Sequence, residues 1–223
     1  MSAIGNSIAD RRLQSYGRSI QGWVAQLRGD SDDALGFHRE AVTLAPDPMA
    51  RAAVLQFAGE AQAAAGDLTR ARADLEQSLD LLSRMSFPQL DCWALGRLTE
   101  VELADGHTAR ARELASRALG LGPKFRYGAG LAERMLGRVA LAERDLPRAS
   151  AHLEAALRIF RELEAAYEIA RTLLEVGILV RTAGDDGAAA HFSEARGLFA
   201  TLGVPAWSER AARLAGDPGP AAP

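Results

Sequence analysis

Residues 59–82, GEAQAAAGDLTRARADLEQSLDLL, carry the pattern that decides the fold. A turn begins at Gly66, with Gly59 seven residues before it and Ala71 and Ser78 five and twelve residues after it. The apolar side chains that follow the turn recur every three or four residues, which places them on one face of a helix. The stretch therefore predicts two helices that cross closely on either side of a tight turn.

The same pattern recurs along the chain. Successive turns begin at Gly29, Gly66, Gly106, Arg144 and Gly184, so they are 37, 40, 38 and 40 residues apart. The residues seven before these turns are Gly22, Gly59, Thr99, Gly137 and Gly177, and those five after are Ala34, Ala71, Ala111, Ala149 and Ala189. A glycine inside a helix costs about 1 kcal/mol relative to alanine, so its recurrence at one position indicates a packing role.

Prolines mark the passages between hairpins, at Pro46, Pro88, Pro123 and Pro205. The predicted hairpins span 10–46, 49–87, 89–122, 126–164 and 166–203, followed by a capping helix at 204–215. Residues 1–9 resemble the end of an earlier hairpin, and residues 216–223, rich in Pro, Gly and Ala, are expected to be disordered. We expect Ser31, Thr69 and Thr108 to be helix N-caps, and Pro147 to lie in the first turn of its helix.

This pattern resembles the tetratricopeptide repeat (TPR) from about residue 10 to residue 203, with each second helix about one turn longer. The resemblance implies an all-α fold, a right-handed superhelical array (α-solenoid) of about five TPR-like helical hairpins plus a C-terminal capping helix.

A finer resemblance lies in residues 167–177, YEIARTLLEVG, and 199–211, FATLGVPAWSERA. These look like the repeat region of large ATP-binding bacterial transcriptional regulators of the LuxR type (the MalT-like group) and of related signalling ATPases. The chain lacks their Gly-x-x-x-x-Gly-Lys-Ser/Thr loop, so it is either a piece of such a regulator or a small relative that kept the array.

Composition excludes several classes of function. The net charge of −3 argues against direct nucleic-acid binding, and no apolar run reaches the length of a membrane span. The single cysteine, Cys92, excludes an internal disulfide, and the first ten residues have no pattern of a secretory signal. We therefore expect a cytoplasmic protein that acts neither on nucleic acid nor at a membrane. Nearly all of the basic residues are arginines, which is typical of proteins from a GC-rich, bacterial genome.

No residue pattern supports catalysis, a cofactor or a metal. Gly128 and Gly130 lack the preceding strand and third glycine of a dinucleotide loop. The acids from Asp30 to Asp33 resemble the start of a calcium loop, but Leu35 and Ala41 stand where glycine and glutamate are required. We expect a protein that is not an enzyme and needs no cofactor.

The TPR resemblance implies that the first helices of the hairpins line a concave groove. Its expected partner-binding residues are Arg134, Arg138, Arg171 and Arg181 toward the C-terminal end, Glu60 and Glu100 in the middle, and Trp23, Trp93 and Tyr16 at the other end. Arginines suit an acidic segment of a partner, because they bind carboxylates in bidentate fashion. The alternative is that the arginines only solvate a helix face and pair with acids such as Glu133 or Glu175.

The leading hypothesis is a protein–protein interaction scaffold that binds a protein or peptide, as the regulatory array of a transcriptional or signalling ATPase would. A second hypothesis is a sensor domain whose groove binds a small molecule or peptide. Self-association through the ends of the array is a further option, because the first hairpin has no polar cap.

Overall fold

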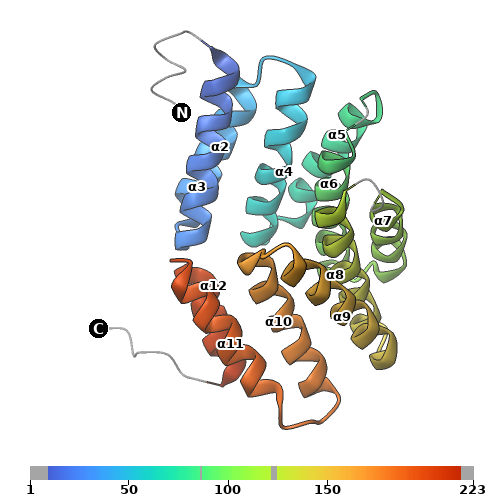
Figure 1. Cartoon of the computed structure of the whole chain (residues 1–223). Coiled ribbons are helices and arrows are strands. Elements are labelled where there is room, and N and C mark those ends of the chain that lie inside the picture. Colours follow the sequence, from blue (N-terminus) through green and yellow to red (C-terminus); the bar gives the residue numbers. More distant parts are fainter. Residues whose placement is uncertain (1–9, 86, 122–124, 217–223) are drawn as a thin grey trace. The chain divides into compact units, whose positions relative to one another are not determined.

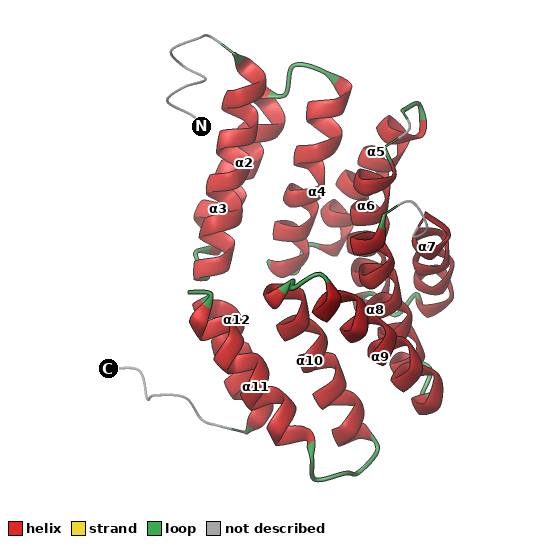
Figure 2. Cartoon of the chain, viewed as in Figure 1, coloured by secondary structure: helices red, strands yellow, loops and turns green. Residues whose placement is uncertain are grey.

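The computed structural model describes residues 10–85, 87–121 and 125–216, and every regular element in these ranges is a helix (Figure 2). The predicted fold class, an all-α solenoid of TPR-like hairpins, is confirmed. The predicted N-terminal remnant and C-terminal tail lie outside the described residues, except for residue 216. The helices are α2 (Arg11–Arg28), α3 (Ser31–Leu44), α4 (Pro48–Ala64), α5 (Leu68–Ser83), α6 (Pro88–Ala104), α7 (Thr108–Leu121), α8 (Arg126–Ala142), α9 (Leu146–Glu162), α10 (Ala166–Thr182), α11 (Ala188–Thr201) and α12 (Pro205–Ala215) (Figure 1).

The chain forms two compact units, residues 1–118 and residues 119–223. In the first unit, α2 pairs with α3 and α4 pairs with α5, while α6 leads through a tight turn into α7. In the second unit, α8 pairs with α9, α10 pairs with α11, and α12 packs on α11. None of the described helices is both long and apolar enough to cross a membrane.

The recurring glycines mark the points where the two helices of a hairpin touch. A β-carbon built at Gly59 would lie 2.8 Å from Leu75 Cγ, and one built at Gly137 would lie 2.7 Å from Leu153 Cγ. These distances are below van der Waals contact, so only glycine fits opposite such a side chain. In the third hairpin Thr99 takes the place of the glycine and is fully buried.

Each turn contains a residue in the left-handed region of backbone space. The φ angles are 94° at Gly29, 86° at Gly66, 81° at Gly106 and 79° at Gly184, and Arg144 adopts 61°. The prediction of Thr69 as an N-cap is wrong, because the carboxylate of Asp67, directly after the turn, accepts a hydrogen bond from the Arg70 N–H.

Two further predictions concern helix starts. The N-cap of α3 is Asp30 and not the predicted Ser31, which is already the first residue of the helix. Pro147 lies in the first turn of α9, as predicted. In both hairpins the aspartate at the end of the turn is the N-cap. The second helix therefore begins one or two residues earlier than predicted from Ser31 and Thr69.

Second helices also pack against the first helix of the following hairpin. Leu82 of α5 lies between Ala52 of α4 and Ala94 of α6 in one apolar cluster. In the second unit, Ala149 and Leu153 of α9 pack with Leu179 of α10. A first helix inside a unit is thus covered on two sides by second helices.

Candidate interaction surface

The α2 helix carries an exposed apolar stripe. Tyr16, Ile20, Trp23, Val24 and Leu27 follow one another at helical spacing, and we call them the α2 stripe. Ile20 is 46% exposed, Trp23 38% and Val24 36%, whereas Tyr16 and Leu27 are partly buried. Half of the six exposed large hydrophobic residues in the described part of the chain therefore lie on one helix face.

Comparison between the hairpins explains why Val24 is exposed. Val24 stands two residues after Gly22, as Ala61, Val101 and Leu179 stand two residues after the corresponding positions of later hairpins. Those three are buried, and Leu179 is covered by the preceding second helix, α9. Within the described residues no second helix precedes α2. The α2 stripe is therefore an exposed apolar face at a position that a preceding second helix covers in later hairpins.

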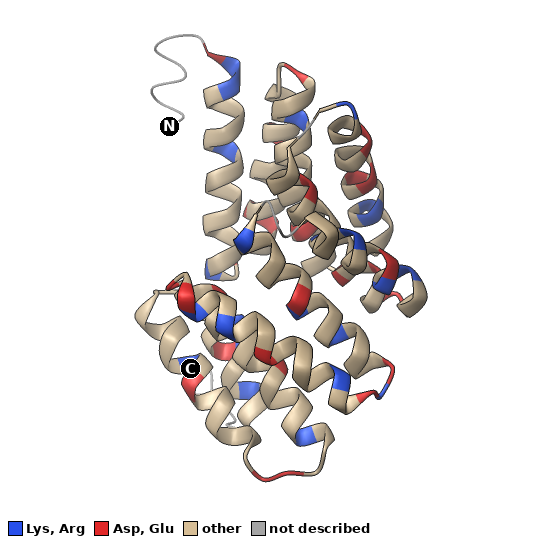
Figure 3. Cartoon of the chain, turned by 45° about the vertical axis from the view of Figure 1, so that its right-hand side comes forward, with Lys and Arg blue, Asp and Glu red and all other residues tan. Residues whose placement is uncertain are grey.

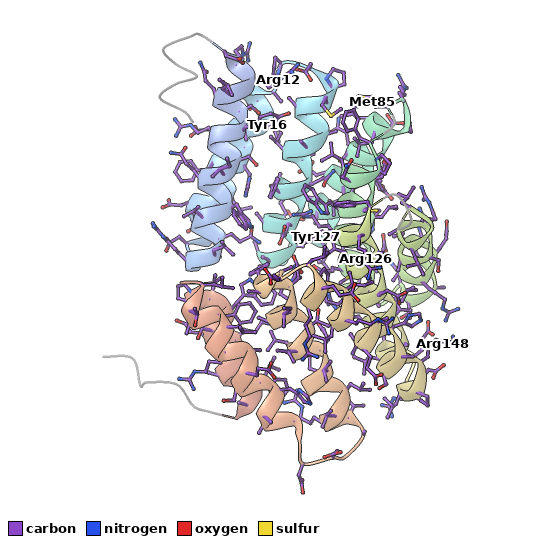
Figure 4. All side chains as sticks on the ribbon, in the orientation of Figure 1. Arg12, Tyr16, Met85, Arg126, Tyr127 and Arg148 are labelled. Atoms are coloured by element: carbon purple, nitrogen blue, oxygen red, sulfur yellow. The ribbon has the colours of Figure 1, made fainter. Side chains whose placement is uncertain are left out.

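All four charged residues of α2 are arginines, Arg11, Arg12, Arg18 and Arg28 (Figure 3). Arg12 lies near the start of the helix with Tyr16 one turn further on (Figure 4), and its guanidinium binds Asp47 at 2.9 Å and 2.5 Å. Arg18 pairs with Glu40 at 2.8 Å. The helix itself carries no acidic residue, but the charges of Arg12 and Arg18 are balanced by these acids of neighbouring elements.

The other predicted groove residues of the first unit are partly buried. Glu60 accepts a hydrogen bond of 2.7 Å from Arg97, whose guanidinium lies 5.0 Å from the centre of the Phe57 ring. Trp93 and Glu100 lie on α6 and are also partly buried. Glu60 is therefore held in an ion pair between two first helices.

Arg134 is 2% exposed and forms an ion pair with Glu168, which is also buried. Tyr127 donates a hydrogen bond of 2.7 Å to the same carboxylate, and the Arg134 guanidinium lies over the Phe160 ring. Burial alone would raise the pKa of Glu168, but the charges of Arg134 and Arg171 outweigh it, so the pKa lies below its usual value. Burial, followed by the charge of Glu168, raises the pKa of Tyr127. Arg134 is thus enclosed in the second unit and not presented to a partner.

The three other predicted arginines also have partners inside the second unit. Arg138 lies 3.4 Å from Glu175, as the alternative interpretation of the sequence held. The Arg171 guanidinium lies 4.8 Å from the centre of the Trp207 ring on α12. Arg181 donates a hydrogen bond of 2.9 Å to the Leu214 carbonyl, which fastens α12 to α10.

The single cysteine of the chain, Cys92, lies in the first unit. Cys92 is buried, and burial together with the Asp91 charge raises the pKa of its thiol to about 11. In the described part of the chain, no three His, Cys, Asp or Glu residues are placed to hold a metal ion together. The sequence prediction missed Ile20 and Val24, although their spacing from Trp23 was visible.

No protein-family model and no curated protein matches the sequence. Among solved structures, the apo form of RapI is similar at a TM-score of 0.66 and 14% identity, over 91% of this chain and 76% of RapI. A Rap protein complexed with Competence and Sporulation Factor is similar at a TM-score of 0.72 and 14% identity, over 92% of this chain and 56% of that one.

A third similar structure is a Signal Transduction ATPase with Numerous Domains (STAND) protein with a tetratricopeptide repeat sensor, from Pyrococcus horikoshii. Its TM-score is 0.64 at 14% identity, over 91% of this chain and 32% of that protein. Likeness at this level of identity concerns the fold. Over about nine-tenths of its length, the chain is therefore similar in fold to TPR-like repeat proteins.

Proposed function

We propose that the chain is a non-enzymatic protein-interaction scaffold whose α2 stripe receives an acidic amphipathic helix of a partner protein. The observation that carries this proposal is the exposure of Val24 at a position that is buried in later hairpins. Exposed apolar patches mark interaction sites, and tryptophans such as Trp23 commonly supply much of the binding energy.

The nature of the occupant follows from what covers the same face elsewhere in the chain. Leu179 is covered by a helix, α9, which contributes the small and branched side chains of Ala149 and Leu153. A partner helix with one apolar face would reproduce this packing. Arg28, next to Leu27 at the end of the stripe, favours an acidic residue at the edge of that helix.

Of the predicted groove residues, Trp23 and Tyr16 enter this proposal directly. The roles of Glu60, Glu100, Trp93, Arg138, Arg171 and Arg181 in partner binding remain predictions. Arg134 is not part of the proposed contact, because it is buried against Glu168.

The test is affinity capture from cells of the source organism, followed by titration of the captured partner's mapped binding segment. We compare the parent chain, a Trp23→Ser/Val24→Gln variant and a Leu163→Gln control, which changes an exposed leucine in the second unit. The proposal expects an acidic helical segment that binds parent and control and binds the α2 variant about tenfold or more weakly. Equal binding to all three, or no captured partner, would overturn it.

A second candidate function is a sensor for a peptide or small molecule, within the regulatory array of a transcriptional or signalling ATPase. Its support is the likeness in fold to a Rap protein complexed with Competence and Sporulation Factor and to a STAND protein with a TPR sensor. This candidate expects a saturable thermal shift with a small ligand or peptide, and an ATP-hydrolysing protein among the captured partners. A captured partner that does not hydrolyse nucleotides would support the scaffold function and argue against the array of an ATPase.

A further inference from the structure

A pocket of about 370 Å³ lies in the first unit, between α3, α4 and the start of α5. Its volume is in the range of small-molecule sites. Leu35 and Val42 of α3 and Ala58 of α4 supply apolar lining, and His38, Gln62 and Asp74 supply polar groups. The pocket is separate from the α2 stripe, because no residue of α2 lines it.

The pocket exists because small or polar residues replace larger apolar ones. Ala58 corresponds by repeat position to Leu98 of α6, and Asp74 corresponds to Leu114 of α7. Both leucines are buried at the next junction. The space that Leu98 and Leu114 fill there is left open between the first two hairpins.

His38 is a polar residue at a position where the second and fourth hairpins have leucine. It is 1% exposed, and neither of its ring nitrogens has a hydrogen-bond partner among the described residues. Sixteen residues after the recurring glycine the chain has His38 in the first hairpin but Leu75 in the second and Leu153 in the fourth. A buried polar group without a partner is destabilising, so packing alone gives no reason for a histidine here.

The other polar groups of the pocket are also acceptors. Gln62 Oε1 is buried without a hydrogen-bond partner in the described part of the chain. Burial raises the pKa of Asp74, against a hydrogen bond from Gln62 and the charges of Arg51 and Arg70. Burial also disfavours the charged form of His38 and lowers its pKa to about 4. The ring is therefore neutral at pH 7, and one of its nitrogens is a hydrogen-bond acceptor. The Nε2 edge of the His38 ring packs against Gly22 on α2, so the carboxylate of Asp74 and the amide oxygen of Gln62 are the acceptors that suit a cationic hydrogen-bond donor in the pocket.

The rim of the pocket has the opposite character. Arg39 and Arg70 line it and are exposed, and Arg70 lies 3.6 Å from Asp67. Arg39 therefore offers a guanidinium for a carboxylate next to the solvent.

We propose that this pocket binds a small zwitterion with a primary ammonium group and a carboxylate, of the free amino acid type. The ammonium group donates to Asp74 and Gln62, the carboxylate binds Arg39, and an aliphatic portion lies on Leu35, Val42 and Ala58. This site is independent of the proposed protein-binding surface, and either can fail without the other.

The experiment titrates the full chain with each standard free L-amino acid by calorimetry and ligand-observed NMR. Any amino acid that binds is then compared with its N-acetyl form, which lacks the ammonium group, and its amide, which lacks the carboxylate. The variants are Asp74→Asn, Arg39→Gln and Ala58→Leu, which restores the leucine of the next junction. Asp80→Asn, at an exposed position of the same helix α5, is the matched control.

The proposal expects at least one amino acid to bind saturably, with affinity reduced about tenfold or more by N-acetylation, amidation and each pocket variant but unchanged by Asp80→Asn. It is overturned if no amino acid binds below about 10 mM, or if binding survives Asp74→Asn. Equal binding of the amide also overturns it, since that outcome indicates a peptide N-terminus. If Ala58→Leu does not fold, Asp74→Asn and Arg39→Gln at less buried positions decide the question.

Discussion

The imidazole ring of His38 packs directly against the backbone of Gly22, and a β-carbon built at Gly22 would lie 2.7 Å from His38 Cε1 and Nε2. The ring is enclosed on another side by Phe57, to which it is stacked at a centroid distance of 6.3 Å. The distance between α2 and α3 is therefore set by Gly22, which has no side chain, and by the imidazole ring of His38.

The first prediction is that Gly22→Ala lowers the free energy of unfolding. Overpacking a closed core costs about 1–3 kcal/mol, whereas alanine in place of a helical glycine contributes about 1 kcal/mol. Urea unfolding should therefore show a net loss of roughly 1 kcal/mol, and His38→Ala should rescue it in the double variant. Gly36→Ala on α3 is the control, because no atom lies within 4 Å of a β-carbon there, and it should stabilise the protein. A Gly22→Ala protein as stable as the control would refute the packing argument.

The second prediction concerns acid stability. Burial disfavours the charged ring of His38 and lowers its pKa from the ordinary 6.5 to about 4 in the folded chain. Between these values the unfolded chain binds a proton that the folded chain does not, so stability falls as pH drops from about 6.5 to about 4. At about 1.4 kcal/mol per unit, the loss attributable to His38 approaches 3 kcal/mol.

Thermal unfolding measured across this pH range should show the slope in the parent chain and lose it in His38→Leu, which copies the leucine of the second and fourth hairpins. His191→Gln serves as the control for removing a histidine at a partly exposed position. If the slope persists in His38→Leu, another group titrates in this window.

The third prediction is that Arg144→Gly stabilises the second unit. Arg144 adopts a φ of 61° at the turn position where Gly29, Gly66 and Gly106 stand in the first three hairpins. A side chain in the left-handed region costs roughly 1 kcal/mol, and Arg144 is exposed, so its removal should raise stability by about that amount. Arg158→Gly, at an exposed position inside α9, should instead destabilise by about 1 kcal/mol. Calorimetric melting temperatures that fall for both variants would contradict the prediction.

The sequence predicted the hairpins because each one repeats the same local geometry. Gly59 and Leu75, or Gly137 and Leu153, lie at a fixed spacing across a short turn, so the periodicity carries the contact. The helix starts were less predictable, since Asp67 competes with Thr69 for the same cap within two residues. Local pattern thus determined the elements and left their ends uncertain by a residue or two.

The surface could not be predicted as well, because exposure depends on contacts that local spacing does not encode. Arg134 and Glu168 are 34 residues apart, and no periodic pattern indicates that they pair in the core. In the same way, Val24 and Leu179 occupy one repeat position, yet within the described part of residues 10–216 only Leu179 of the two has a helix over it. A repeat alignment predicts which face a residue is on, whereas the neighbouring hairpin determines whether that face is reached by solvent.

The final prediction is that replacing only Arg134 strongly destabilises the second unit, whereas replacing Arg134 and Glu168 together is tolerated. Arg134→Met takes the ion-pair partner away from the buried Glu168 carboxylate, although Tyr127 and the charge of Arg171 still act on it. Breaking such a buried pair costs about 3–5 kcal/mol. Arg134→Met/Glu168→Leu removes both charges and should recover most of that loss. Arg138→Met is the matched control, because its partner Glu175 is only partly buried, and it should cost about 1 kcal/mol or less.

Because the pKa of Glu168 lies below its usual value of 4.5, the contribution of the pair should decline as the pH falls below about 4.5, where the unfolded chain takes up a proton before the folded chain does. Urea titrations of the four proteins at pH 7 and pH 3.5 measure both effects. A small loss for Arg134→Met at pH 7 would show that the guanidinium is not needed inside the unit and would return it to the predicted groove. The expected large loss instead means that alanine replacement of all four predicted arginines would test folding and not binding, so partner-binding variants should leave Arg134 intact.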